Sequence, residues 1–429
     1  MPSSGILGRI KSLDAFHRNI VIVFLGTSLV NVFSLLYQLL IAHSLSPADF
    51  AAFNVLLAIL TLVSTPFGTL QMGITKYVAE FNARGSSSKI TALLSGLFRR
   101  ASILAIIALF ILLISSGYIT HTLKIPSLSS GYILALLLSL SCIMPVFSGG
   151  LQGLEFFGYL TSASVLSGAL KIILSFILII LGYKISGALG ALLISNVIAL
   201  FLLYFPLKGH ISLAIPQEAI NYKEIWIYLL PMAISYCCFM ILVNSDMLLV
   251  KYFFNPQESG IYALAQMVGK IFLFLPMAIG TVMFPRTSGL NASNMDTRNT
   301  LKGSLIYSAI LCLCALLFYN LFPGLVLKVL TGKAYPECIF LGRLFSLSMS
   351  FFTLLSMLMA YFLSVNDLRF IKYMVFFTAL QVAAIILTGG ISLIAVQAIL
   401  CVNAALLLIV FFLVLSAKGK RQINNAIAI

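Results

Sequence analysis

Charged side chains are scarce in this sequence. Aspartate, glutamate, lysine and arginine make up only 9% of its 429 residues, whereas 61% of the residues are hydrophobic. Soluble domains are about 25% charged and about 45–50% apolar, so this composition excludes an ordinary water-soluble protein. A helix that crosses a bilayer needs about 20 mostly apolar residues, and the chain has room for about 12 such helices. The sequence therefore predicts an all-α, polytopic membrane protein.

Residues that bind metals or form disulfides are also few. The chain has seven cysteines and four histidines. Six of the cysteines lie within apolar runs, and only Cys338 lies near an expected loop. The histidines are scattered along the chain without the spacing of a ligand set. We therefore predict no disulfide framework, no metal site and no cofactor.

Acidic residues are fewer than half as numerous as basic ones. There are 11 of them against 26 lysines and arginines, which gives a formal net charge of +15. In a soluble protein this excess would favour a nucleic-acid partner. In a membrane protein it has a topological explanation, because short cytoplasmic loops are rich in lysine and arginine. We therefore expect membrane lipids, and no nucleic acid, as partners of this chain.

Long apolar runs between charged breaks predict where the helices lie. They are expected at 19–44, 50–74, 92–118, 131–153, 159–183, 186–207, 225–252, 259–284, 303–327, 339–364, 372–389 and 392–416. With the N-terminus in the cytoplasm, 18 lysines and arginines fall in inner segments and only five in outer ones. This asymmetry predicts a multi-pass protein of the cell membrane, a bacterial or archaeal plasma or inner membrane, with both termini cytoplasmic.

The two halves of the chain share a short pattern. Three pairs of similar residues recur 209 positions apart: Pro47 with Pro256, Asp49 with Glu258, and Phe53 with Tyr262. An even number of spans in each half would give both halves the same orientation, a plan known in transporters whose substrate site lies between the halves. We predict an N-terminal six-helix bundle at 1–208, a cytoplasmic connection at 209–224 and a C-terminal six-helix bundle at 225–429.

Several predicted spans contain polar residues at helical spacing. Polar groups are costly against lipid, so they usually face a cavity or a neighbouring helix. Asn31 and Gln38 lie on one face of the first span, and Gln266 lies with Lys270 on one face of the eighth. Ordinary helix packing explains the serines and threonines of the same stripes. The larger polar groups are therefore the candidate substrate ligands.

Four charged residues lie inside the predicted spans. Lys171 and Lys270 are about 11 or 12 residues from the ends of their helices, which is too deep for easy snorkelling. Arg343 is a further substrate-binding candidate, although it lies near enough to the outer end of its span to reach the surface. Asp246 either pairs with a basic residue or forms part of an ion-coupling site. Because three of the four charges are basic, the sequence favours an anionic cargo such as a phosphate or pyrophosphate.

Five stretches resemble those of a known family. They are LSPADFAA at 45–52, GITKYVAEFNARG at 73–85, LQGLEFFGYLTSASVLSGALK at 151–171, ESGIYALAQ at 258–266 and FPRTS at 284–288. On these stretches the chain resembles the polysaccharide and O-antigen flippases of the multidrug/oligosaccharidyl-lipid/polysaccharide exporter superfamily. Ala51 and Ala52 depart from the pattern, because this family often has glycine there.

This resemblance implies both a fold and a function. The fold is the MATE-like architecture, a V-shaped pair of six-helix bundles. The function is to flip a polyprenyl-pyrophosphate-linked oligosaccharide from the cytoplasmic to the outer leaflet, by alternating access, for surface polysaccharide biosynthesis. We expect Lys171 and Lys270 to attract the pyrophosphate, and Asn31, Gln38 and Gln266 to bind the sugars. Such a protein is not an enzyme, and polysaccharide polymerase machinery is its candidate protein partner.

Three other functions remain open at this point. A cation-coupled multidrug antiporter of the same superfamily would use an intramembrane carboxylate such as Asp246, but it usually transports organic cations. A glycan polymerase or ligase would need a sizeable outer loop, and the longest outer breaks, near 119–130 and 328–338, are short. A scaffold without transport activity would have no need for buried charges, which are costly to keep in a membrane.

Overall fold

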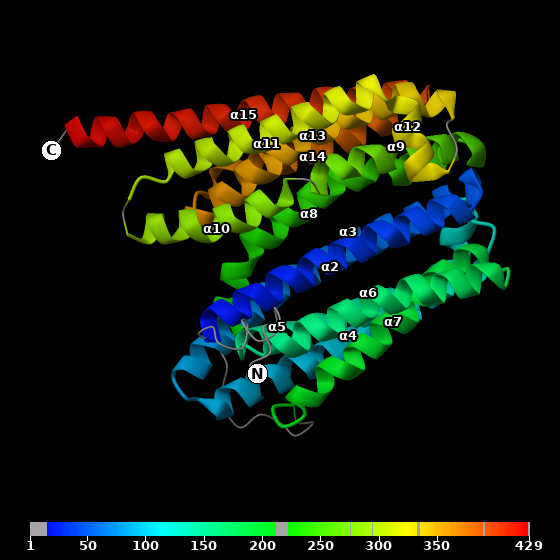
Figure 1. Cartoon of the computed structure of the whole chain (residues 1–429). Coiled ribbons are helices and arrows are strands. Elements are labelled where there is room, and N and C mark those ends of the chain that lie inside the picture. The colour runs from blue at the N-terminus through cyan, green and yellow to red at the C-terminus, as the bar shows by residue number, and fades with distance from the viewer. Residues whose placement is uncertain are drawn as a thin grey trace, which may run out of the picture. The chain divides into compact units, whose positions relative to one another are not determined.

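The computed structural model describes residues 15–211, 222–274, 276–293, 295–332, 335–388 and 391–427. These residues form helices and short turns, with no strand among them, which confirms the all-α prediction (Figure 1). The helices are α2 (Ala15–Ser44), α3 (Pro47–Ala83), α4 (Ser87–Thr122), α5 (Leu128–Gly153), α6 (Phe157–Ile180), α7 (Lys184–Leu207), α8 (Tyr222–Phe253), α9 (Pro256–Phe274), α10 (Met277–Ala292), α11 (Arg298–Leu321), α12 (Pro323–Thr331), α13 (Pro336–Ser364), the 3-10 turn η1 (Leu368–Phe370), α14 (Ile371–Thr388) and α15 (Leu393–Ile427).

Eleven helical segments among the described residues are long and apolar enough to cross a membrane. The predicted span that is absent from this set is the eighth, at 259–284, which consists of two helices, α9 and α10, separated before Pro276. Proline has no backbone N–H, so it leaves the carbonyl four residues earlier without its helical donor. Here that carbonyl belongs to Phe272, and the Thr353 hydroxyl of α13 donates to it at 2.9 Å. The break is therefore compensated by a neighbouring helix.

The described residues form two compact units. The first comprises those up to Leu45 together with Val63–Leu229, and the second comprises Ser46–Leu62 together with those from Leu230 on. Two helices, α3 and α8, thus contribute one end to each unit. The predicted limits of the bundles at 208 and 225 remain a prediction, and most of the predicted connection at 209–224 lies outside the described residues.

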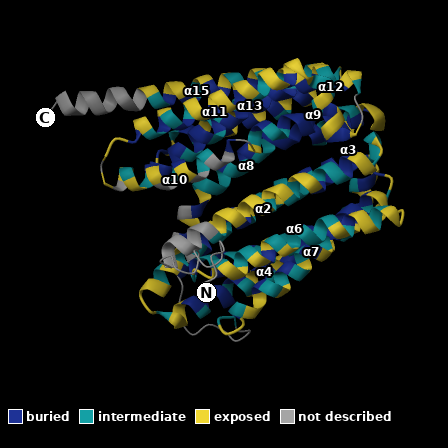
Figure 2. Cartoon of the chain, viewed as in Figure 1, coloured by how far each residue is buried: buried dark blue, intermediate teal, exposed yellow. Residues whose placement is uncertain are grey.

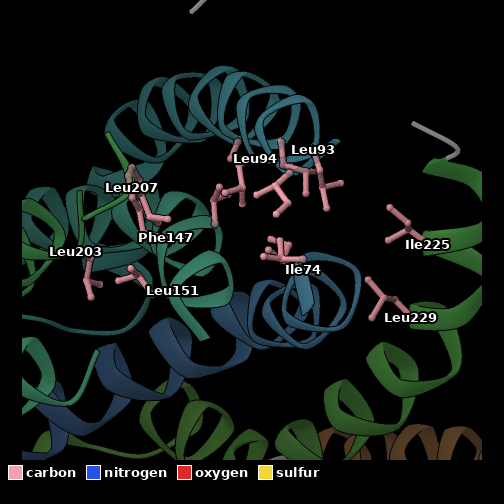
Figure 3. Packing of buried hydrophobic residues seen from close by; sticks show 14 of the residues in the cluster. Ile74, Leu93, Leu94, Phe147, Leu151, Leu203, Leu207, Ile225 and Leu229 are labelled. Carbon is pink, nitrogen blue, oxygen red and sulfur yellow. The ribbon is translucent and has the colours of Figure 1, made fainter. Parts of the chain in front are cut away.

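A hydrophobic cluster holds one end of the first unit together. Ile74 of α3, Leu94 of α4 and Phe147 of α5 are each 2% exposed or less, with Ile225 and Leu229 of α8 beside them (Figure 3). In contrast, α4 exposes eight large apolar side chains between Ile103 and Tyr118, with exposed fractions from 45% to 85% (Figure 2). An uncharged helical face of this kind suits contact with lipid.

The helix starts at the two repeated motifs are both capped by side chains. At the start of α3, the Asp49 N–H donates to Ser46 Oγ at 3.2 Å, and Ser46 Oγ donates to Asp49 Oδ2 at 2.9 Å. At the start of α9, the Glu258 N–H donates to Asn255 Oδ1 at 2.8 Å, and the Asn255 N–H donates to Glu258 Oε2 at 3.4 Å. Both are capping arrangements that satisfy free N–H groups of a first helical turn, which supports an internal duplication.

Within the second unit these two helix starts lie against each other. A Cβ atom placed on Gly260 of α9 would lie 2.6 Å from the carbonyl carbon of Pro47 in α3. Backbone atoms at that distance cannot move aside, so the approach of the two helices requires glycine at this position. The equivalent residue in the first half, 209 positions earlier, is Ala51.

Candidate functional site

The first site is a lysine in the middle of an apolar helix of the first unit. Lys171 is 14 residues after the start of α6 and nine before its end. Its ammonium group donates to Ser34 Oγ of α2 at 3.0 Å and lies 5.4 Å from the centre of the Tyr37 ring. The Tyr37 hydroxyl in turn donates to the carbonyl of Ala188 in α7 at 2.9 Å. The lysine is half-buried, so a hydroxyl and an aromatic face hold its charge while part of the side chain remains exposed.

Small residues bring α2 and α6 close enough to form this site. A Cβ atom on Gly168 would lie 2.9 Å from the Phe33 ring, and one on Gly26 would overlap the Thr161 side chain. Glycine at such contacts allows two membrane helices to approach closely. The close approach is what places Ser34 within hydrogen-bonding distance of Lys171.

The other predicted ligands of the first unit lie on the same helix as Ser34. Asn31 is exposed, one turn before Ser34, and Gln38 is half-buried, one turn after it. Their spacing of three and four residues puts all three on one face of α2. The structure thus brings Ser34 of this face against Lys171, with Asn31 and Gln38 one turn away on either side of Ser34.

The second site is a buried carboxylate in the second unit. Asp246 of α8 is 0% exposed. The Tyr262 hydroxyl of α9 donates to its Oδ2 at 2.9 Å, and Gln266 Nε2 donates to both carboxylate oxygens at 3.1 and 3.3 Å. Gln397 of α15 donates to the Tyr262 hydroxyl at 2.7 Å. A buried carboxylate is stable only when it is paired or hydrogen-bonded; here α9 supplies both donors, and α15 supplies the donor to Tyr262.

Lys270 provides positive charge near this carboxylate. It lies one turn after Gln266 on α9 and interacts electrostatically with Asp246. It is four residues from the end of α9, beside the break before Pro276, and not in the middle of a continuous span. Both readings of Asp246 from the sequence, pairing with a basic residue and ion coupling, stay predictions.

A second set of buried amides connects α14 and α15 to α8. Gln381 Nε2 donates to the carbonyl of Leu242 in α8 at 2.8 Å, and Asn403 Nδ2 of α15 donates to Gln381 Oε1 at 3.1 Å. Both residues are at most 4% exposed. The second unit therefore has two groups of buried polar contacts, one that joins α8, α9 and α15 and one that joins α8, α14 and α15.

Three amide oxygens of these two groups have no hydrogen-bond partner among the residues that the structure describes. They are Gln266 Oε1, Gln397 Oε1 and Asn403 Oδ1, all fully shielded from solvent. Buried polar atoms are rarely left without a partner. The two groups therefore have more acceptors than the donors around them can satisfy.

The remaining predicted ligand lies apart from these groups. Arg343 is exposed, seven residues after the start of α13, and interacts electrostatically with Tyr319 of α11. Its position near a helix end suits contact with the membrane surface. No contact that the structure describes joins Arg343 to Asp246 or to Lys270.

Several residues of these sites were not predicted from the sequence. Tyr37, Gln381, Gln397 and Asn403 all lie within apolar runs. For the last three a signal was available, since an amide side chain in the middle of a hydrophobic span is itself unusual. For Tyr37 there was none, because tyrosine is common in membrane helices near their ends.

Comparisons with known proteins identify the family. A model of the family described as "Polysaccharide biosynthesis protein" matches residues 16–291. A "Putative O-antigen transporter" of Shigella flexneri is 24% identical over 305 residues, which cover 69% of this chain and 72% of that protein. A membrane protein of Methanocaldococcus jannaschii is 25% identical over 326 residues, covering 71% of this chain and 76% of that protein.

Solved structures of similar fold are transporters of the MOP superfamily. An inward-facing multidrug resistance MATE family transporter has a TM-score of 0.74 at 16% identity, over 91% of this chain and 96% of that one. A transporter from Pyrococcus furiosus, described as having a binding pocket of reverse polarity, has a TM-score of 0.64 at 17% identity, over 93% and 96%. The chain is a multi-pass membrane protein with the transporter fold of the MOP superfamily, and it belongs to the polysaccharide biosynthesis protein family.

Proposed function

We propose that this protein is a transporter that flips a polyprenyl-pyrophosphate-linked oligosaccharide from the cytoplasmic to the outer leaflet by alternating access. The family assignment and the relative named as an O-antigen transporter support this function. Of the residues that the structure describes, Lys171 carries the proposal. Its half-buried ammonium group, deep in an apolar helix, suits an anion that enters the membrane with its lipid.

The predicted residues have different roles in binding the substrate. Lys171 and Lys270 attract the pyrophosphate, whose charge would otherwise be costly in a medium of low dielectric constant. Asn31 and Gln38 donate and accept hydrogen bonds from sugar hydroxyls, while the polyprenyl chain stays in the bilayer. Arg343 contributes positive charge near the membrane surface.

Two parts of the proposal concern the second unit. Gln266 binds sugar only in a state in which it releases Asp246, since it is 1% exposed and donates to that carboxylate here. Asp246 couples transport to a cation. Transport to the outer leaflet supplies the lipid-linked oligosaccharide to polysaccharide polymerase machinery there. Both chain termini lie in the cytoplasm in this proposal.

The first experiment is deletion of the gene in its native host. We expect loss of surface glycan and accumulation of the lipid-linked intermediate on the cytoplasmic side of the membrane, with recovery when the wild-type gene is restored. Accumulation of the intermediate distinguishes a block in flipping from a block in synthesis. Normal surface glycan in the deletion strain would contradict the function.

Variants of the two lysines test the charge mechanism. Lys171→Gln combined with Lys270→Gln keeps polarity but removes both charges, so export should fall by about tenfold or more, the effect of losing roughly 1.4 kcal/mol of binding. Protein abundance in the membrane must stay unchanged. The matched control is Lys89→Gln on the exposed first turn of α4, which should export normally. Unchanged export in the double variant would exclude the lysines as anion ligands.

The second candidate is a cation-coupled multidrug antiporter, and the buried carboxylate of Asp246 is the observation that favours it. A deletion strain with normal glycan and increased sensitivity to cationic drugs would establish this alternative. The positive charge of Lys171 argues against an organic cation as cargo, because like charges within a cleft of low dielectric constant repel strongly.

A further inference from the structure

The surroundings of helix α4 change at two adjacent arginines. In the stretch 87–98, all of which the structure describes, no large apolar side chain is exposed. Leu93 and Leu94 of this stretch belong to the hydrophobic cluster of the first unit (Figure 3). Arg99 and Arg100 follow, and both are exposed. The rest of the protein therefore covers the apolar side chains of α4 up to the arginines.

An exposed apolar face begins directly after them. Eight large apolar side chains between Ile103 and Tyr118 have exposed fractions from 45% to 85% (Figure 2). Arg99 lies four residues before Ile103, and Arg100 lies seven residues before Ile107, so both arginines are on the same face of α4 as these side chains. The two charges are thus at one end of a surface that suits contact with lipid.

The length of this face matches the thickness of a membrane. Tyr118 comes 19 residues after Arg99 within one continuous helix, which at about 1.5 Å per residue is about 28 Å. The hydrocarbon core of a bilayer is about 30 Å thick. Tyrosine is enriched where this core meets the head groups, so Tyr118 suits one boundary and the arginines suit the other. The arginines are then at the level of the lipid phosphates.

Guanidinium groups bind phosphate well at this level. Each arginine presents a planar fork of N–H donors that can bind two phosphate oxygens at once. Adjacent residues of a helix point about 100° apart, so the two forks cover a wide arc of the exposed face. A free phosphate ion would make no use of the apolar side chains that follow, whereas the acyl chains of a lipid would lie along them. The surface therefore favours a lipid over a soluble anion.

We propose that Arg99 and Arg100 form a binding site for anionic phospholipids, in the leaflet on the α3–α4 side of the membrane. In the orientation predicted from the loop charges, this is the cytoplasmic leaflet. The guanidinium groups bind the phosphate of the head group, and the acyl chains contact the exposed face of α4. The site is independent of the proposed function, because its ligand is a lipid of the bilayer and not the cargo.

Lipid binding to the purified full-length protein in detergent tests the site. Native mass spectrometry counts the lipids bound during titration with phosphatidylglycerol or with phosphatidylcholine. We expect tighter binding of phosphatidylglycerol, and the difference should shrink as salt is added. Arg99→Gln combined with Arg100→Gln should lower the affinity for phosphatidylglycerol by about thirtyfold, about fivefold for each charge. The affinity for phosphatidylcholine should stay unchanged.

Two controls separate this site from general charge and from the fold. Lys89 is exposed in the first turn of α4, ten residues before Arg99. It is therefore about 15 Å away along the helix, beyond a Debye length of about 8 Å, so Lys89→Gln should keep the affinity for phosphatidylglycerol. Arg99→Lys combined with Arg100→Lys keeps both charges and should bind within about fivefold of the wild type. A loss as large as in the glutamine variant would attribute the effect to misfolding and not to charge.

Photochemical labelling locates the bound lipid. Phosphatidylglycerol with a photoreactive group near the start of one acyl chain should label residues 103–107 in the wild type, and much less in the double glutamine variant. Phosphatidylcholine with the same group should label this segment equally in both proteins. Each labelled site is found by mass spectrometry of peptides.

Several results would overturn the proposal. They are equal affinity for the two phospholipids, an equal loss of affinity in Lys89→Gln, and labelling by phosphatidylglycerol away from α4. Tighter binding of polyprenyl pyrophosphate than of phosphatidylglycerol at these arginines would assign them to the cargo instead. A stable dimer that excludes the label from 103–107 would assign the face to a second copy of the chain. Glycan export is measured separately, so failure of the lipid site would leave the flippase function standing.

Discussion

Each unit has a charged side chain deep in an apolar helix, Lys171 in the first and Asp246 in the second, but the surroundings of the two differ. Lys171 in the first unit is half-buried and has one hydroxyl and one aromatic ring as polar neighbours. Asp246 in the second unit is 0% exposed and accepts hydrogen bonds from Tyr262 and Gln266 of α9, and Gln397 of α15 donates to Tyr262 in turn. One charge is weakly held and accessible, and the other is enclosed and strongly held.

This difference suggests different ligands for the two units. A large anion needs an accessible charge whose own partners are easily displaced. To bind one, Lys171 would break its hydrogen bond to the Ser34 hydroxyl. A small cation can reach an enclosed carboxylate, and there the surrounding amides can replace its water. The comparison therefore favours Lys171 of the first unit as the first contact of an anionic cargo, and Asp246 of the second unit as the coupling residue.

Removal of the two charges should give the largest difference between the units in lost free energy of unfolding. Asp246→Ala leaves the Tyr262 hydroxyl and the Lys270 charge without their buried partner, so we expect a loss of about 3 kcal/mol in the free energy of unfolding. Lys171→Ala should lose less than about 1 kcal/mol, because the lysine is partly exposed. Thermal unfolding in one detergent measures both. Equal losses would show that the two sites are equally enclosed, contrary to the comparison.

Removal of a single hydroxyl from each site should give a smaller contrast. Tyr262→Phe deletes a donor to a carboxylate and an acceptor for Gln397, at a cost of about 2 kcal/mol. Tyr37→Phe deletes a donor to the Ala188 carbonyl, for which the average cost in a membrane protein is about 0.6 kcal/mol. Each change removes one hydroxyl group from a tyrosine, so the loss of packing contacts is similar in the two variants. A larger loss at Tyr37 would place the more critical network in the first unit.

The fold could be predicted from the sequence because it depends on the composition of long segments and not on single residues. Long apolar runs can only form helices in a bilayer, since every backbone group must be satisfied internally. The exception was the span at 259–284, where the sequence predicted one helix and the structure has α9 and α10. Pro276 alone did not decide this, because Pro66, Pro145 and Pro231 lie within continuous helices. The hydroxyl that donates to the Phe272 carbonyl at the break belongs to Thr353, which is distant in sequence.

The sites could be predicted from the sequence only in part, because they depend on which helices are neighbours. Depth in a helix is a local property, so Lys171 and Asp246 stood out from the sequence. Their partners did not, since Tyr37 is 134 residues from Lys171 and Gln397 is 135 residues from Tyr262. The structure also changes the context of Gln266, which the sequence placed among the sugar ligands and which here donates to Asp246.

A pair of ion pairs, one in each unit, provides the smallest contrast. Arg84 binds Glu80 at 2.7 Å in the first unit, and Arg369 binds Asp367 at 2.7 Å in the second. The side chain of Glu80 is 38% exposed, whereas that of Asp367 is 6% exposed and also accepts the Arg369 backbone N–H at 3.3 Å. Glu80→Gln should therefore cost less than about 0.5 kcal/mol, and Asp367→Asn about 1 kcal/mol. Both are measured by thermal unfolding at low and high salt. Salt screens exposed charges most strongly. The effect of Glu80→Gln on the free energy of unfolding should therefore vanish at high salt, and that of Asp367→Asn should persist. The reverse pattern would show that enclosure does not distinguish the charges of the second unit.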